Sequence, residues 1–223
     1  MSETAFEPYR PFEPGAEFDR QVRVLIGLGY PALAGLTDAA FADLMAPLRA
    51  VALERGRSVN PPTPARVPFL LVITNALVPP DLAMSLTRLG SRPGFADFDP
   101  DDLRRFSPIA GLPVPPVPAY LALDVDRGKE TLNVTPDRAL EVITAQHRTP
   151  LTIDEGIALI THYPRALEKN NCFSLAGSRR ADRRVPALWI SKGAPKVGWC
   201  WAGNPHTWLG TASCAGRAGP PPA

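Results

Sequence analysis

Residues 184–202 read RVPALWISKGAPKVGWCWA. Two β-rich runs, Arg184–Ile190 and Val197–Ala202, lie on either side of a loop that is rich in turn residues. This pattern predicts an antiparallel hairpin whose side chains alternate between two faces. A third strand over Thr207–Ser213 would complete a C-terminal β-meander.

Two earlier segments predict strands of the sheet that the meander extends. Val67–Thr74 is almost wholly apolar and of strand length, which indicates a buried central strand. Tyr120–Val125 alternates as a second strand, and a turn follows it. The sheet is therefore predicted to be built from segments far apart in the chain.

Helices are predicted before and between these strands. Apolar spacing favours a helix over Glu17–Leu28 and another that starts near Thr37, which together form a helical hairpin. Asp137–His147 predicts a third helix, and a capping box of Thr152 and Glu155 starts a fourth. We expect an α+β fold: a mostly antiparallel sheet with an N-terminal helical hairpin and a two-helix insert before the C-terminal β-meander.

The chain of 223 residues is long enough for a sizeable core. Proline punctuation predicts a flexible lead over residues 1–16, a single domain over residues 17–217 and a disordered tail over residues 218–223. No apolar stretch approaches the length of a membrane-spanning helix, and the N-terminus lacks the apolar core of a signal peptide. We therefore expect a cytoplasmic protein with no membrane partner.

Residues 169–223 differ in composition from the rest of the chain. They carry a formal charge of +7, with Asp182 as their one acid, whereas residues 1–168 carry −5. They also hold every cysteine and tryptophan of the protein: Cys172, Cys200, Cys214, Trp189, Trp199, Trp201 and Trp208. This composition predicts an anionic partner. The alternative is that the bases are solvated or paired with the protein's own acidic surface.

The leading hypothesis is a binding module for an anionic, phosphate-containing ligand, either a nucleotide or RNA. A loop at residues 175–180 offers Gly177 for close backbone approach and a serine hydroxyl beside two arginines. Tryptophans would stack on bases, whereas Trp189 and Cys200 have the pattern of core residues. The predicted binding residues are Ser178, Arg179, Arg180, Arg183, Arg184, Lys192, Lys196, Trp199, Trp201 and Trp208.

A second hypothesis is a hydrolase or transferase that acts on a small anionic substrate. Cys172 would be the nucleophile and His206 its base, because a nearby base activates a thiol. Asn204 or Asn171 would orient the imidazole. A third hypothesis is a structural or partner-binding protein that uses its acidic N-terminal part and the proline-rich segment 113–118 as contacts.

A zinc site is chemically possible but not favoured. Cys172, Cys200, His206 and Cys214 make up a Cys₃His set. Their spacing lacks the paired cysteines of a zinc knuckle, and buried free cysteine is a common structural residue. No cofactor is predicted with a motif of its own, because the usual phosphate-loop and dinucleotide fingerprints are absent from the sequence.

The sequence resembles a family of uncharacterised, mainly actinobacterial proteins that is classed as a domain of unknown function. Four stretches carry the resemblance: FDRQV…LGYPALAGL, YLALDVDRG, RTPLTIDEGIAL and, above all, RRVPALWISKGAPKVGWCWAGNPHTWLGTASC at residues 183–214. The resemblance covers roughly residues 17–217. It implies a cytoplasmic bacterial protein with a single domain, and it brings no activity to any residue.

Overall fold

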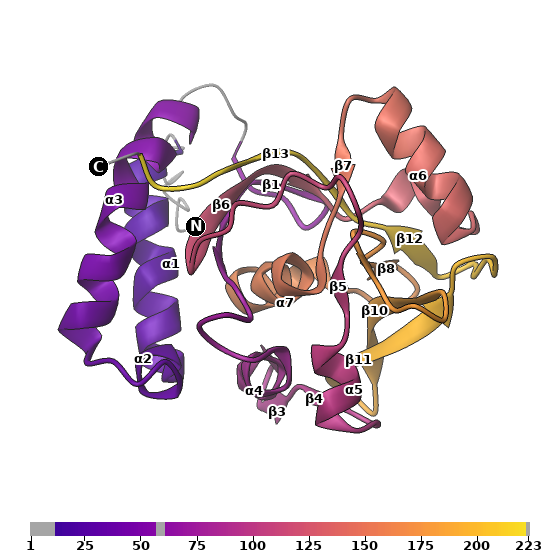
Figure 1. Ribbon diagram of the computed structural model, residues 1–223, viewed down its shortest axis with the longest axis horizontal. Helices are drawn as coiled ribbons and strands as arrows, with labels where there is room; N and C mark the ends of the chain where they lie inside the picture. Colours follow the sequence, from indigo (N-terminus) through magenta and orange to yellow (C-terminus); the bar gives the residue numbers. More distant parts are fainter. Residues whose placement is uncertain (1–11, 57–60, 222–223) are drawn as a thin grey trace, which may run out of the picture.

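The computed structural model describes residues 12–56 and 61–221. These residues form seven α-helices and two main sheets, with α7 in the centre of the molecule (Figure 1). The helices are α1 (Pro14–Leu28), α2 (Tyr30–Leu33), α3 (Asp38–Gly56), α4 (Pro80–Leu86), α5 (Pro100–Arg104), α6 (Pro136–Ala145) and α7 (Ile153–His162). The α+β class and the mostly antiparallel sheets predicted from the sequence are confirmed.

The strands form a four-stranded sheet of order β1-β6-β13-β7, a five-stranded sheet of order β12-β8-β10-β11-β4, and two short pairs, β2–β3 and β5–β9. The strands of the larger sheets are β1 (Arg66–Ile73), β4 (Phe95–Ala96), β6 (Ala119–Asp126), β7 (Thr149–Pro150), β8 (Cys172–Ser174), β10 (Arg184–Ser191), β11 (Ala194–Trp201), β12 (Leu209–Thr211) and β13 (Ser213–Ala218). The strands of the pairs are β2 (Arg88–Leu89), β3 (Arg92–Pro93), β5 (Ser107–Pro108) and β9 (Ser178–Arg179).

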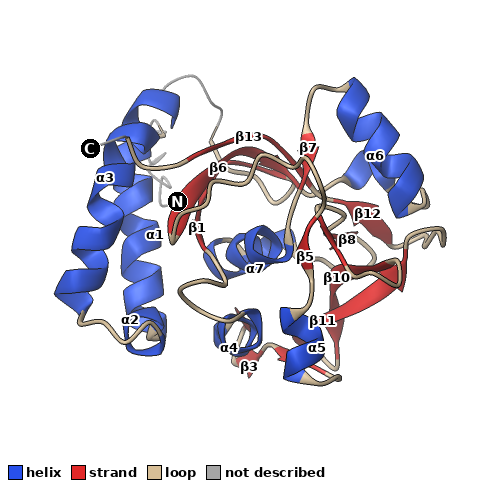
Figure 2. Cartoon of the chain, viewed as in Figure 1, coloured by secondary structure: helices blue, strands red, loops and turns tan. Residues whose placement is uncertain are grey.

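The N-terminal helical hairpin is present as α1 and α3, which pack against each other at one side of the molecule (Figure 2). Helix α1 begins at Pro14, inside the predicted flexible lead. Proline is favoured at the first helical position, because the N–H group that it lacks would have no partner within the helix. The lead of residues 1–11 lies outside the described residues, as do residues 222–223 of the predicted tail.

Strand β1 is buried, as predicted, but it lies at an edge of its sheet instead of in the centre. The Gln21 side chain of α1 donates to the Phe69 carbonyl (3.1 Å) and accepts from the Leu71 N–H (2.7 Å). The His162 Nε2 atom lies 2.9 Å from the Leu71 carbonyl oxygen. Burial lowers the pKa of His162 to about 4, so the ring is neutral and Nε2–H donates. These side chains satisfy an edge that would otherwise require another strand.

The β10–β11 hairpin is longer than the sequence predicts. Its strands run directly into a two-residue turn of Lys192 (φ +51°) and Gly193 (φ +75°), which is the positive-φ geometry of tight hairpins. Ala194 and Pro195, which read as loop residues, begin β11. Proline is tolerated there because it is near the start of the strand.

The predicted C-terminal meander does not form beyond this hairpin. Strand β12 pairs in parallel with β8, on the far side of β10. Strand β13 then leaves the five-stranded sheet and pairs with β6 and β7 in the other sheet. The last strands therefore connect the two sheets, and one continuous apolar core extends through both.

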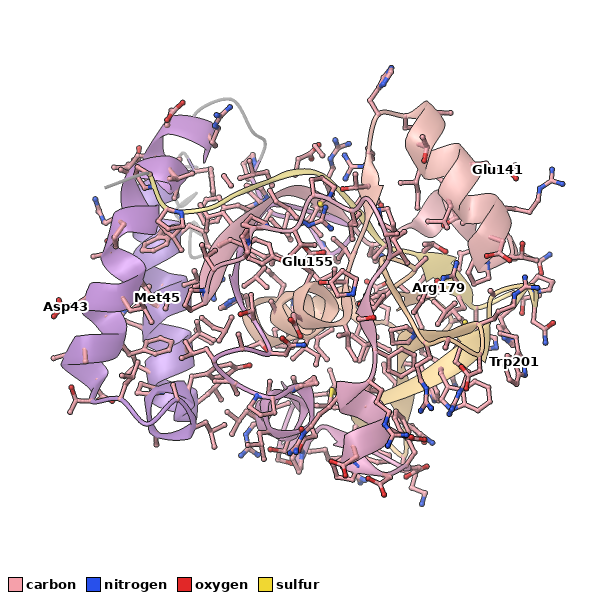
Figure 3. The ribbon with its side chains drawn as sticks, in the orientation of Figure 1. Asp43, Met45, Glu141, Glu155, Arg179 and Trp201 are labelled. Carbon is pink, nitrogen blue, oxygen red and sulfur yellow. The ribbon has the colours of Figure 1, made fainter. Side chains whose placement is uncertain are left out.

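Helix α7 lies in the centre of the molecule, beneath the four-stranded sheet (Figures 1 and 3). Its predicted capping box is confirmed, with the Glu155 carboxylate accepting from the Thr152 N–H at 2.7 Å. The same carboxylate forms an ion pair with Arg217 of β13 at 2.5 and 2.8 Å, and accepts from the Tyr120 hydroxyl at 2.7 Å. Glu155 and Arg217 are 0 % and 1 % exposed, so this pair ties β13 to the centre of the fold.

No helix in the described part of the chain has the length and apolar character needed to cross a bilayer.

Candidate functional site

The β10–β11 hairpin carries tryptophans on both faces. Trp201 is paired with Arg184 and Trp199 with Pro186, so the two indoles lie on one face, as the alternation predicts. Trp189 is paired with Lys196 and lies on the opposite face. Each face of this hairpin therefore offers a different aromatic surface.

The Trp199–Trp201 face lies at the surface of the protein. The two ring centroids are 4.9 Å apart, and the Arg184 guanidinium lies 5.1 Å from the Trp199 ring. Trp201 is 45 % exposed and lies at the periphery of the molecule (Figure 3). This pair is therefore accessible to a partner at the surface.

Small residues on the opposite face make room for the Trp189 ring. Gly198 is paired with Ala187, and a Cβ atom added at Gly198 would lie 2.0 Å from the Trp189 Cη2 atom. The indole therefore lies across strand β11 only because residue 198 is glycine. Trp189 is half-buried: it packs against the core, as predicted, and it also lines a cavity.

The cavity beside Trp189, here called the Trp hollow, has a volume of about 570 Å³. Its aromatic wall is an edge-to-face pair of Trp189 and Trp208, with ring centroids 6.0 Å apart and an interplanar angle of 68°. The His206 ring lies 5.4 Å from the Trp208 ring and does not itself line the cavity. The residues that line the hollow are Lys169, Asn170, Cys172, Trp189, Ile190, Gly193 and Trp208.

The polar groups of the Trp hollow favour an acceptor or an anion. Lys169 is its one charged lining residue, and no carboxylate lines it. Lys192 lies in the adjacent turn, and within residues 12–56 and 61–221 neither lysine forms an ion pair. Neither indole N–H of this wall donates to a protein acceptor in the same ranges.

The Cys172 thiol at the base of the hollow is not an activated nucleophile. It donates to the Glu168 carbonyl at 3.3 Å, and burial raises its pKa. His206 makes no hydrogen bond to it, and the exposed Asn204 side chain bonds neither residue. The predicted set of Cys172, His206 and Asn204 is therefore not assembled, because the thiol faces a backbone carbonyl instead of an imidazole.

The possible zinc set is not assembled either. Cys214 lies in the four-stranded sheet beside Thr149. Cys200 is opposite Val185 on β10. Cys172 precedes Phe173, which is opposite Leu188, so Cys172 is level with Trp189. At about 3.3 Å per residue, the two cysteines are separated along β10 by roughly 13 Å. Across the described ranges, no three His, Cys, Asp or Glu side chains could hold a metal ion together.

Most of the predicted cationic residues are paired with acids of the protein itself. Arg179 and Arg183 pair with Asp137 at 3.0 and 2.8 Å. The other pairs are Arg180 with Asp102 (2.7 Å), Arg184 with Asp182 (2.7 Å) and Lys196 with Asp97. The acidic partners on α5 and α6 come from the negatively charged part of the chain. The +7 segment is thus largely neutralised within the fold, as the alternative hypothesis holds.

The predicted anion loop at residues 175–180 is part of the interior. The Gly177 N–H donates to Leu151 O at 2.9 Å, and the Ser178 N–H donates to Leu175 O at 3.0 Å. The Ser178 Oγ atom accepts from the Ile153 N–H at 3.0 Å, and the residue is fully buried. These two backbone donors are therefore already used, one by Leu151 between β7 and α7 and the other by Leu175 of the loop itself.

A family model described as a family of unknown function, DUF5701, matches residues 24–220. The chain belongs to this family. No curated protein and no solved structure matches it. The residues of this DUF5701 member that the sequence interpretation missed are Lys169, Asn170 and Trp189. Trp189 could have been found from Gly198, because a glycine inside a predicted strand marks a place where another group approaches the backbone closely.

Proposed function

We propose that the protein binds a mononucleotide in the Trp hollow. One observation carries this proposal: a pair of edge-to-face tryptophans encloses a cavity whose single charged lining residue is a lysine. The cavity volume of about 570 Å³ is within the range of small-molecule sites, roughly 300–1,000 Å³.

The base would lie against the indoles of Trp189 and Trp208. Both indoles line the cavity, and stacking on tryptophan contributes about 1–3 kcal/mol per base. The two indole N–H groups, which have no acceptor in the described protein, would donate to carbonyl or ring nitrogen acceptors of the base.

The phosphate would contact Lys169 and the turn that carries Lys192. Both side chains are exposed, and Lys169 lines the mouth of the hollow. The absence of any carboxylate from the lining removes the repulsion that an anion would otherwise meet. The ammonium groups of Lys169 and Lys192 suit a single compact anionic group, and the nearby Arg92 guanidinium already donates to the Lys192 carbonyl at 2.7 Å.

A free nucleotide is a better ligand than RNA. A polyanion needs several unpaired cations along a surface, and its binding energy comes from the counterions that they displace. Arg179, Arg180 and Arg184 are largely buried and paired with Asp137, Asp102 and Asp182. We propose that these arginines hold α5 and α6 against the five-stranded sheet.

We place this function in the cytoplasm. Cys172, Cys200 and Cys214 are free thiols, as expected in a reducing compartment, and burial raises the pKa of Cys200 and Cys214 to about 11. The actinobacterial source that the sequence resemblance implies stays a prediction.

Isothermal titration calorimetry with the four ribonucleoside 5′-monophosphates, adenosine and inorganic phosphate tests the proposal. We expect at least one monophosphate to bind more tightly than both adenosine and phosphate. Lys169→Met should reduce monophosphate affinity toward that of the nucleoside, and Lys129→Met, at an exposed site outside the hollow, serves as the control. Failure of all four monophosphates to bind folded protein at millimolar concentration would contradict the proposal.

A further inference from the structure

A second cavity lies at the N-terminus of α7, in a different part of the molecule from the Trp hollow. It has a volume of about 480 Å³, and it is bounded by the start of α7, the residues after β1 and the proline-rich segment 113–118. Most of its lining is apolar. Asp154 is the only charged residue among those that line it. We call this cavity the Asp154 cleft.

The cleft is poor in hydrogen-bond donors. Pro108, Pro115, Pro116 and Pro118 line it, and proline has a carbonyl oxygen but no N–H. The Thr74 side chain donates to the carbonyls of the proline-rich segment, at 3.2 Å from both Val117 O and Pro118 O, and its hydroxyl proton is used there. The prolines of the cleft wall therefore add no N–H donor, and the Asp154 carboxyl is the one charged acceptor among the lining residues.

The first turn of α7 does not provide an anion site. The Thr152 N–H donates to Glu155 Oε2, the Ile153 N–H to Ser178 Oγ and the Glu155 N–H to Thr152 Oγ1. These are the donors that an anion at a helix N-terminus would need. Because the protein already uses these three N–H groups, they are not free to bind an anion in the cleft.

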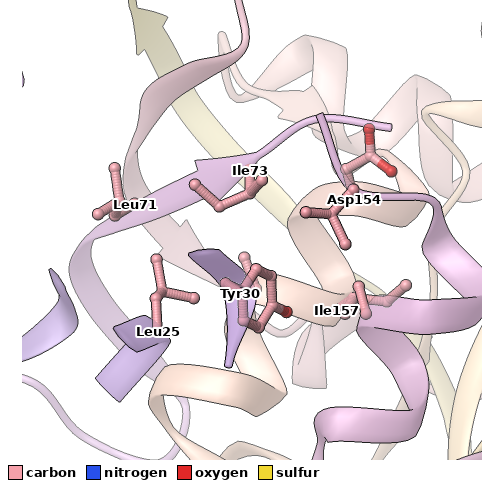
Figure 4. A pocket seen from close by; sticks show the side chains of 9 residues that line it. Leu25, Tyr30, Leu71, Ile73, Asp154 and Ile157 are labelled. Carbon is pink, nitrogen blue, oxygen red and sulfur yellow. The ribbon is translucent and has the colours of Figure 1, made fainter. Parts of the chain in front are cut away.

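The Asp154 carboxyl is left without a cationic partner in the described protein. Its Oδ2 atom accepts from the Asn75 N–H at 3.0 Å, and it forms no ion pair. Figure 4 shows Asp154 at one end of a small internal cavity, with its carboxyl directed away from the Tyr30 ring. The adjacent carboxyl, Glu155, has the opposite environment, because Arg217 and Tyr120 satisfy it.

From these contacts we infer that the Asp154 cleft binds a small apolar amine, whose ammonium group pairs with the Asp154 carboxylate. The hydrocarbon part of the amine lies against Phe106, Pro115 and Val117. An ammonium group supplies three donors to a wall of acceptors, and its charge complements the single acid there. This site is independent of the nucleotide site proposed above.

Binding of the amine depends on the ionisation of Asp154. Burial, together with the nearby Glu155 carboxylate, raises the pKa of Asp154 to about 7, and Tyr30 on α2 and Tyr120 on β6 are the other titratable groups that interact with it. On the adjacent α4, Asp81 is already paired with Arg104. Amine affinity should therefore rise by about tenfold between pH 6 and pH 8, as the carboxylate forms while the amine stays protonated.

The test is calorimetric titration of the full chain with benzylamine and its neutral analogue, benzyl alcohol. We expect benzylamine to bind at least tenfold more tightly at pH 8, and Asp154→Asn to abolish that preference. Asn keeps an oxygen acceptor for the Asn75 N–H, so this variant should fold. Val117→Phe, which fills the cleft and leaves Asp154 in place, should weaken both ligands.

Three results would overturn the inference. Equal affinity of the two compounds would show that the carboxylate does not recognise the ammonium group. Unchanged benzylamine binding by Asp154→Asn or Val117→Phe would place any binding elsewhere. Absence of benzylamine binding at millimolar concentration would also contradict it, and none of these results bears on nucleotide binding in the Trp hollow.

Discussion

The Trp hollow and the Asp154 cleft are cavities of similar volume with opposite chemistry. The hollow is walled by two tryptophans and bordered by Lys169, whereas prolines and valines wall the cleft and Asp154 is its only charged residue. The hollow lacks a carboxylate and the cleft lacks a cation. On the two proposals above, one fold would select ligands of opposite charge by placing a single titratable group in each cavity.

The two cavities also differ in how they are supported. The wall of the hollow depends on close packing, since Trp189 lies across Gly198 with no room for another carbon atom. The cleft depends on a polar network, since Glu155 and Arg217 fix the first turn of α7 against β13. A change to one support should leave the other cavity intact, and the following predictions test this.

The largest expected effect is on the support of the cleft. Arg217→Met leaves the Glu155 carboxylate buried without a counter-ion, which costs about 3–5 kcal/mol of unfolding free energy. Chemical denaturation measures this loss. Arg66→Met removes an ion pair on the same sheet whose arginine is 57 % exposed, so it should cost at most about 1 kcal/mol. Similar losses of unfolding free energy in Arg217→Met and Arg66→Met would contradict the claim that the buried pair supports the cleft.

The next effect is on the wall of the hollow. Trp208→Ala should weaken nucleotide binding by about 5- to 150-fold, because it removes one stacking surface. Gly198→Ala should weaken binding too, since its methyl group displaces the Trp189 ring. Calorimetry measures both, with Trp201→Ala on the opposite face as the control. A loss in the Trp201 variant as large as in the Trp208 variant would move the site to the other face.

A smaller effect distinguishes the cleft by its pH dependence. The folded protein holds the Asp154 proton up to a pKa of about 7, whereas the unfolded chain releases it near 3.8. The unfolded state therefore binds fewer protons in this window, and this group lowers wild-type stability as pH rises from 4 to 7. Asp154→Asn should match the wild type near pH 4 and become relatively more stable by pH 8. Equal stability of the two proteins across this range would contradict the raised pKa.

The smallest expected effect concerns the paired arginines. Arg183 is 73 % exposed in its pair with Asp137, so Arg183→Ala should change the unfolding free energy by about 0–1 kcal/mol. Nucleotide affinity should not change, because this residue does not line the hollow. A tenfold loss of affinity in Arg183→Ala would show that the arginine surface, and not the hollow, holds the ligand.

Local signals in the sequence predicted much of the fold. The capping box of Thr152 and Glu155 predicted the start of α7, and the apolar run of β1 predicted a buried strand. The position of β1 at a sheet edge was not predictable, because its edge is satisfied by Gln21, about fifty residues earlier, and by His162, about ninety residues later. Such long-range pairing leaves no trace in the periodicity of the strand.

The candidate site was predicted only in part. The unusual composition of residues 169–223 identified the region, and Trp208 and Lys192 are at or beside the hollow. Net charge alone did not reveal that Asp97, Asp102 and Asp137 neutralise the basic residues, because these acids lie about 40 to 100 residues away in the chain. Asp154 was not predicted as a site residue, because an acid in the first turn of a helix is common. Its raised pKa comes from burial, which depends on the tertiary fold.

The four tryptophans allow a direct test of where the nucleotide binds. Each indole N–H gives its own signal in a ¹H–¹⁵N correlation spectrum, and substitution of each tryptophan assigns the signals. Titration with the best-binding monophosphate should shift the signals of Trp189 and Trp208 and leave those of Trp199 and Trp201 in place. Shifts confined to Trp199 and Trp201, or no shift in any of the four, would contradict binding in the Trp hollow.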